Sequence, residues 1–278
     1  NMAENQMLDL DIVSYIDIKN SKEMVEQNKN FVKNYYHHYK IGGYKLFLDG
    51  SPQGKTAWMS KPYEGEEEYR GYPIYTNEQV EEYVKTALKE NMQLITHCNG
   101  DAAAEQLIEA FEKQNTQNNF RPVMIHAQLV RHDQLKRMKK INMIPSFFVA
   151  HVYYWWDIHI KNFGERAQDI SPIKSAIEEN LVYTMHQDTP VIMPNMFETI
   201  WCAVTRRTQK GIELGENQKI TVLDAIKGVT INAAYQYFEE NEKGSIEKGK
   251  NADFIIIDKN PLEIEIEDLK NIKILYTI

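Results

Sequence analysis

One stretch of the sequence decides the fold class: Gln93-Leu94-Ile95-Thr96-His97-Cys98-Asn99-Gly100-Asp101-Ala102-Ala103. Its first four residues are typical of a short strand, and His97 and a run of small or polar loop residues follow them directly. A helical pattern then begins at Asp101 and continues to about Gln114. A strand, a loop and a helix in this order form a βα unit. The stretch therefore predicts an α/β protein with a parallel sheet.

The same pattern recurs on both sides of this stretch, and no internal repeat or linker interrupts it. Thr76 and Gln79 predict a capping box at the start of a helix over 76–91, and a helix is also expected over 21–36. Such units build a closed (β/α)8 barrel or an open doubly wound sheet, and fewer than eight of them make an incomplete barrel. Six strand-like runs are visible, namely Leu8–Ile16, Tyr44–Leu48, Gln93–Thr96, Pro122–Ile125, Met143–Phe148 and Leu181–Thr184.

The last part of the chain follows a different pattern. A helix opened by Thr221 and Asp224 is expected to reach about Phe238. The strand-like runs Ala252–Ile257 and Ile272–Leu275 follow with no helix between them, which favours a small β appendage. We therefore predict a partial barrel domain over 1–240 and a separate β-strand segment over 241–278.

Composition excludes several classes of protein. The 278 residues are 42% hydrophobic and 26% charged, as in ordinary globular chains. With 32 Lys+Arg against 40 Asp+Glu the net charge is −8, so we expect neither nucleic acid nor a membrane surface as a partner. No run approaches the roughly 20 apolar residues of a membrane span. Two cysteines and an N-terminus unlike a signal peptide predict a cytoplasmic protein.

Four potential metal ligands lie at or near the carboxyl ends of predicted strands: Lys45, His97, His126 and Asp188. In a parallel barrel these ends converge on one mouth, so residues distant in sequence can share a site. Two imidazoles and a carboxylate suit zinc, and hydrolysis is its natural use. Each residue alone could instead be an ordinary polar group at a strand end. A lysine in an apolar strand needs a further explanation: carbamylation of Lys45, or a pair with Asp49 on the same strand face.

Aromatic residues and two histidines are concentrated over 146–159. This segment could form the wall of a substrate pocket, although such clusters are as often part of the core or of an interface. His37, His38 and His132 are expected to face solvent, and Cys98 is interpreted as a small core residue rather than a ligand.

The motifs of this chain resemble, in order, those of the amidohydrolase superfamily, in the branch called amidohydrolase family 3, which includes N-substituted formamide deformylases. The resemblance covers about 8–278. Its main motifs are Tyr44–Ser51, Thr96–Ala103, Ile125–Gln128 and His186–Val191, and further matches are Ser146–Phe148 with His151, Trp156–His159 and Gly244–Phe254.

The resemblance implies a (β/α)8 TIM barrel with a small β-sandwich built from both chain ends. It also implies hydrolysis of a non-peptide C–N bond, in a small-molecule amide, by a metal-activated hydroxide. One or two divalent ions, expected to be zinc, would be held by Lys45 carboxylated with carbon dioxide, by His97, by His126 and by Asp188. Asp188 would also be the catalytic proton shuttle. The expected substrate wall is His151, Trp156, Asp157 and His159.

One motif of the resembled family is absent, because no His-x-His pair occurs in this sequence. The first two barrel strands also have no counterpart, so we expect a fragment that begins at the third strand. The alternatives are therefore a catalytically inactive fragment or binding module, and a deaminase or isomerase on the same barrel. Because a missing strand would expose the sheet edge at Leu8–Ile16, we expect a homo-oligomer.

Overall fold

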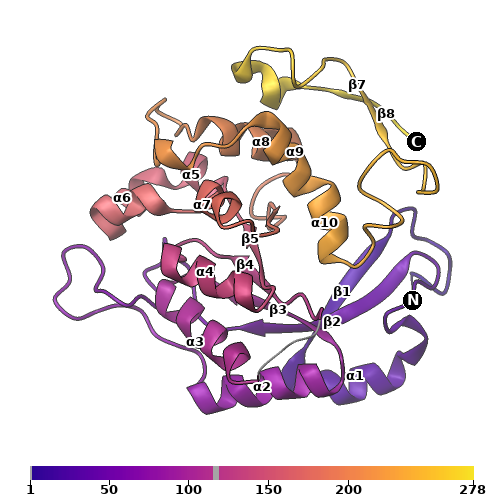
Figure 1. Cartoon of the computed structure of the whole chain (residues 1–278), viewed down its shortest axis with the longest axis horizontal. Helices are drawn as coiled ribbons and strands as arrows, with labels where there is room; N and C mark the ends of the chain where they lie inside the picture. The colour runs from indigo at the N-terminus through magenta and orange to yellow at the C-terminus, as the bar shows by residue number, and fades with distance from the viewer. Residues whose placement is uncertain (1, 115–118) are drawn as a thin grey trace.

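The computed structural model describes residues 2–114 and 119–278. Its main feature is a six-stranded parallel sheet whose strands are ordered as in the sequence (Figure 1). The strands are β1 (Ile12–Asp17), β2 (Tyr39–Phe47), β3 (Gln93–Cys98), β4 (Val123–His126), β5 (Ile144–Phe147) and β6 (Thr184–Met185). Sequential order is that of a barrel, whereas a doubly wound sheet reverses its order at a switch point.

The sheet is open in the part of the chain that the structure describes, because β1 pairs only with β2 and β6 only with β5. The α/β class with a parallel sheet is confirmed, and the closed eight-stranded barrel stays a prediction. Neighbouring helices pack on one another in sequence, α2 on α3, α3 on α4 and α4 on α7. The ten α-helices of the described residues are α1 (Ser21–Gln27), α2 (Asn77–Lys89), α3 (Asp101–Glu112), α4 (His132–Lys140), α5 (His151–Tyr154), α6 (Trp156–Phe163), α7 (Ile173–Glu178), α8 (Met196–Thr205), α9 (Val222–Val229) and α10 (Ile231–Gln236).

The capping box before α2 is confirmed: Thr76 Oγ1 accepts from the Gln79 N–H, and Gln79 Oε1 accepts from the Thr76 N–H at 3.0 Å. The helix expected over 21–36 is wrong in its length, since α1 ends at Gln27. The Asn28 side chain donates to the Met24 carbonyl at 2.8 Å. It thereby competes with the backbone N–H that would bond this carbonyl if the helix continued.

The helix expected from Thr221 to Phe238 is divided into α9 and α10. Thr221 caps α9, accepting from the Asp224 N–H at 3.1 Å. Thr230 interrupts the helix with φ −124° and ψ −97°, values outside the helical region. The start of α9 could be predicted because its cap is a local signal in the sequence. The break at Thr230 could not, because no proline marks it.

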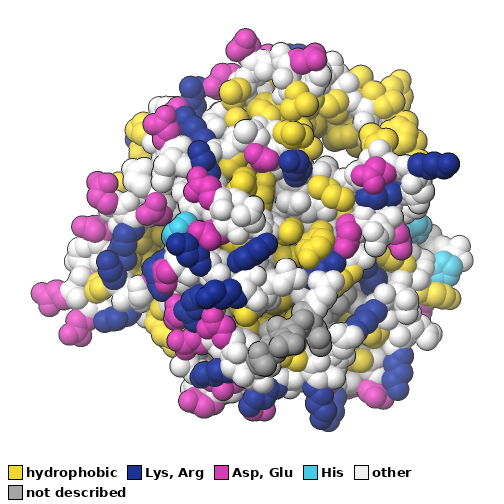
Figure 2. Space-filling view, viewed as in Figure 1, with side chains coloured by type: hydrophobic (Ala, Val, Ile, Leu, Met, Phe, Trp, Pro, Cys, Tyr) yellow, Lys and Arg dark blue, Asp and Glu magenta, His cyan; other side chains and the backbone are white. Residues whose placement is uncertain are grey.

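The C-terminal segment forms a separate antiparallel pair, β7 (Ile255–Ile257) and β8 (Ile274–Thr277). Both strands expose apolar side chains, and Figure 2 shows hydrophobic side chains gathered where Figure 1 draws this pair. The expectation that no helix separates the two strands is wrong, because the 3-10 helix Ile266–Asn271 lies between them and packs on α8. The two strands agree with the expected β appendage, while the β-sandwich and the boundary between 240 and 241 stay predictions. Among the described residues, no helix is both long and apolar enough to span a bilayer.

Candidate metal centre

The carboxyl ends of neighbouring strands bring His97 and His126 together. The register places Cys98 of β3 opposite His126 of β4, so His97 lies one residue from the direct pair. Their ring centroids are 4.6 Å apart with the rings inclined at 78°, and Nε2 of His126 lies 3.0 Å from Nδ1 of His97. Adjacent nitrogens around a tetrahedral zinc ion, each about 2.0–2.1 Å from it, are roughly 3.3 Å apart. The separation of these two nitrogens therefore fits a shared cation.

The loop after β2 orients the ring of His97. Its Nε2 lies 3.2 Å from the carbonyl oxygen of Gly50, which can only accept a hydrogen bond, and 3.1 Å from Nδ2 of Asn99, which donates to the same carbonyl at 2.9 Å. When His97 donates this bond, its Nδ1 presents a lone pair towards His126. Asp49 is buried and anchors the loop, because its carboxylate accepts from the N–H groups of Trp58, Asn99 and Gly100 at 2.7–3.0 Å. Burial raises the pKa of Asp49 to about 7, and these three N–H groups oppose the rise.

A third histidine, His186, extends the arrangement, although the sequence analysis did not select it as a site residue. It follows β6 directly, and its Nε2 lies 3.1 Å from Nδ1 of His126. Its Nδ1 lies 2.9 Å from Oγ of Ser146 on β5. The rule that selected His97, a histidine directly after a strand, would also have selected His186.

Burial keeps the three histidines neutral at neutral pH. It lowers the pKa of His97 to about 4 and that of His186 to about 3, and it holds the pKa of His126 well below 6.5. The nearby Lys45 ammonium lowers all three values further. Neutral imidazole is the form that binds a metal ion.

Lys45 lies on β2 with its Nζ 4.9 Å from the centre of the Phe47 ring. Burial lowers its pKa to about 8, and the charge of Asp188 opposes this shift. Asp49 is engaged by backbone N–H groups, so the alternative of a Lys45–Asp49 pair has no support. The register pairs Phe47 of β2 with His97 of β3, so Lys45 lies two residues before the position opposite His97. Its charge acts on all three histidines.

Asp188 lies in the loop after β6, exposed to solvent and with φ +52°. Within 2–114 and 119–278, no group of three or more His, Cys, Asp or Glu side chains is assembled around a point suited to a metal ion. His97 and His126 thus offer two nitrogen ligands, and a carboxylated Lys45 would supply the third. The donor chemistry and the separation of the two nitrogens therefore fit a divalent ion such as zinc.

The four residues expected to wall the substrate differ in burial and in their neighbours. His151 and His159 are buried, with Nδ1 of His151 3.0 Å from Nε2 of His159. His151 also packs on Phe148, whose ring centre is 5.5 Å from that of His186. Trp156 packs against a second hydrophobic cluster, whose Phe163 also stacks on His159 at 6.0 Å between ring centres. The Asp157 side chain is exposed. Of these four residues, His151 therefore lies nearest to the site histidines His126 and His186.

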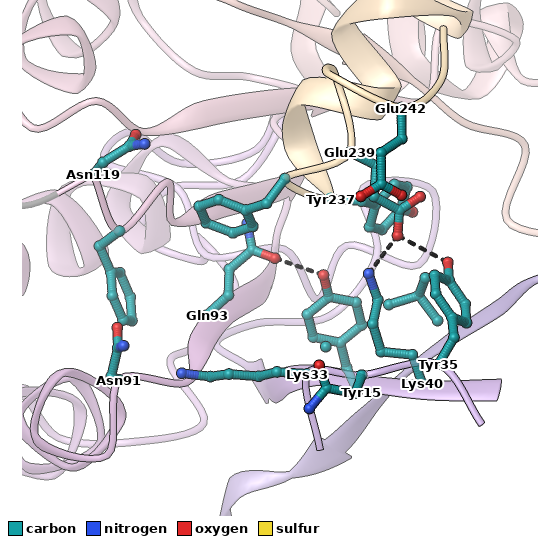
Figure 3. A pocket seen from close by; sticks show the side chains of 15 residues that line it. Tyr15, Lys33, Tyr35, Lys40, Asn91, Gln93, Asn119, Tyr237, Glu239 and Glu242 are labelled. Atoms are coloured by element: carbon teal, nitrogen blue, oxygen red, sulfur yellow. Dashed lines mark hydrogen bonds and ion pairs between the residues drawn. The ribbon is translucent and has the colours of Figure 1, made fainter. Parts of the chain in front are cut away.

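Figure 3 shows a cavity of about 590 Å³ whose wall includes Lys40 and Gln93. These residues lie at the amino ends of β2 and β3, opposite to the ends that carry the histidines. Lys40 forms an ion pair with Glu239 on its wall, Tyr35 donates to Glu239 at 2.8 Å, and Tyr15 donates to Gln93 at 2.5 Å. In parallel barrels the chemistry lies at the carboxyl ends of the strands. This cavity is therefore not the candidate metal centre.

Comparison with known proteins gives one family and several relatives. A family model described as the amidohydrolase family matches residues 1–278. A protein named as an amidohydrolase, YtcJ from Bacillus subtilis, is 26% identical over 86% of this chain and 46% of its own length. The N-substituted formamide deformylase of Arthrobacter pascens is 24% identical over 85% of this chain and 44% of its own length.

Solved structures share the fold. The chain is similar to an uncharacterised metal-dependent hydrolase from Pyrococcus furiosus, with a TM-score of 0.82, 26% identity, and coverage of 94% of this chain and 53% of that one. The chain spans about half the length of the curated relatives that it matches.

Proposed function

The chain belongs to the amidohydrolase family, and from this membership we propose that the protein is a metal-dependent hydrolase of non-peptide C–N bonds in small-molecule amides. The observation that carries the proposal is the 3.0 Å separation between Nε2 of His126 and Nδ1 of His97 at the carboxyl ends of neighbouring strands. The formamide deformylase among its relatives supports an amide as the bond that is cleaved.

In this proposal His97, His126 and a carboxylated Lys45 hold a divalent ion, and Asp188 is a further ligand. A bound zinc ion would polarise the amide carbonyl and lower the pKa of water. The lowered pKa of Lys45 is consistent with its carboxylation, because the neutral amine is the form that attacks carbon dioxide. The N–C bond forms as the nitrogen loses a proton to the bicarbonate buffer, and the resulting carbamate is an anion, which suits a metal ion better than an ammonium does.

We assign the proton transfer to Asp188. Its carboxylate would accept a proton from the attacking water and return it to the leaving nitrogen of the amide. An exposed position in the loop after β6 leaves the carboxylate open to a substrate. The aromatic wall formed by Phe148 with His151 would exclude water from one side of the site.

The test is metal binding by the untagged 278-residue chain, incubated with zinc and bicarbonate, desalted and analysed for metal. We expect close to one tightly bound ion, and its loss in the double variant His97→Ala, His126→Ala. The control double variant His38→Ala, His132→Ala removes two exposed histidines and should retain the ion. Equal metal content in both double variants would refute the proposed site.

A further inference from the structure

We infer that Ser146 and His186 are positioning residues that hold His126 in the tautomer with its proton on Nδ1, which leaves Nε2 free for the ion. The inference rests on the proposed function, because it concerns the same metal site. It assigns a role to two residues from β5 and from the end of β6 that touch no substrate in the proposal.

Geometry provides the first step. The ring of His126 lies between two partners, with His97 facing Nε2 at 3.0 Å and His186 facing Nδ1 at 3.1 Å. The other nitrogen of His186 lies 2.9 Å from the hydroxyl of Ser146. Ser146, His186 and His126 thus form a continuous chain of hydrogen-bonding groups that ends where His97 begins.

The proton positions follow from what each atom can do. If Nε2 of His126 offers a lone pair to an ion, the single proton of the neutral ring must lie on Nδ1. That N–H then donates to Nε2 of His186, so the proton of His186 must lie on its Nδ1. Oγ of Ser146 accepts a hydrogen bond from this Nδ1–H, since a hydroxyl oxygen has free lone pairs. Each group in the chain has one compatible role.

The chain of hydrogen bonds lies in buried, aromatic surroundings, where the loss of one partner is costly. The Phe148 ring lies 6.3 Å from the His126 ring and 5.5 Å from the His186 ring, measured between centroids, and Ser146 and His126 are buried. Water is a poor replacement for a lost partner in such a place. Metal-binding histidines usually donate their second N–H to a carboxylate, a carbonyl or water, and here a histidine backed by a serine takes that part.

The direct test is ¹⁵N NMR of the untagged chain with labelled histidine rings, recorded with zinc bound. Nitrogen shifts and long-range couplings distinguish protonated, unprotonated and metal-bound ring nitrogens, and the variant His186→Phe identifies the His186 signals by their loss. We expect zinc on Nδ1 of His97 and on Nε2 of His126, with the proton of His186 on Nδ1.

Two other outcomes are distinguishable. Zinc bound to both histidines, with the proton of His186 on Nε2 or with His186 itself on the metal, would overturn the positioning role and leave the proposed function intact. Ring signals of His97 and His126 that do not respond to zinc would refute the proposed metal site, and the positioning role with it.

Zinc affinity provides a second readout. Ser146→Ala and His186→Phe should each weaken zinc binding roughly 10- to 100-fold, as loss of an outer partner of a ligand does. The matched control is Thr184→Val, because Thr184 lies opposite Ser146 in the register and its buried hydroxyl donates to Gln236 instead. We expect an unchanged affinity in the control. If all three variants weaken binding equally, the effect is general packing and the positioning role is wrong.

Discussion

Nε2 of His126 and Nδ1 of His97 face one another across neighbouring strands at 3.0 Å. Both nitrogens point into the space between the two rings, which is where a cation would bind. The sheet register and the Gly50 carbonyl hold both rings in place before any ion arrives. Two ligands of the proposed site are therefore already in place. The third, a carboxylated Lys45, would form only when carbon dioxide reacts with the lysine.

Lys45→Met should abolish the stimulation of zinc binding by bicarbonate. Methionine keeps the apolar stem but has no amine to carboxylate, so the third ligand is missing. We expect an affinity loss above the roughly 10- to 100-fold that outer partners contribute. Isothermal titration with and without bicarbonate measures it. Lys33→Met, in the wall of the remote cavity, is the control. A bicarbonate effect that survives in Lys45→Met would rule out the carboxylated ligand.

Asp188→Asn should separate metal binding from turnover. The amide cannot accept and return the proton, so we expect turnover of an active preparation to fall about 10²- to 10⁴-fold while most of the metal stays bound. The assay uses formamides, acyl amino acids and cyclic amides as substrates. Asp9→Asn changes another exposed carboxylate and should have no effect. Turnover of Asp188→Asn near that of the unaltered protein would exclude it as the proton shuttle.

Glu239→Gln should destabilise the fold through Lys40. The two side chains form an ion pair with 10% and 11% of their surfaces exposed, so the variant leaves a buried ammonium without its counter-charge. We expect a loss of about 3 kcal/mol in the free energy of unfolding, since one partner of a buried pair is removed. Urea unfolding gives the value. Glu242→Gln, on the same cavity wall but exposed, should change stability by less than about 0.5 kcal/mol.

Stability should fall as the pH drops from about 6.5 to about 4. Burial holds the pKa values of His97 and His159 at about 4, and those of His126 and His151 well below 6.5. In this window the unfolded chain takes up protons on these histidines that the folded chain does not, so each contributes a slope of up to about 1.4 kcal/mol per pH unit. The raised pKa of Asp49, about 7, offsets about one of these protons. His159→Phe should reduce the slope by about one proton. A free energy of unfolding that is flat between pH 7 and 4.5 would contradict these shifts.

The sequence was most informative where the signal is local. Thr76 and Gln79 predict the start of α2 because a capping box involves four consecutive residues. His97 and His126 could be paired because consecutive βα units place their strands side by side. His186 was missed because the strand was expected to end at Thr184, whereas β6 continues to Met185 and His186 follows it directly. Trp156 could not be placed from the sequence because its neighbours depend on tertiary packing. Only the folded chain shows it packed against a second hydrophobic cluster.

The most direct test of the account is an anomalous-difference map from a crystal of this chain grown with zinc and bicarbonate. We predict one strong zinc peak within coordination distance of Nδ1 of His97 and Nε2 of His126, with density for a carboxyl group on Lys45. A map with zinc bound elsewhere, or with the two nitrogens still joined by a hydrogen bond and no ion between them, would contradict it.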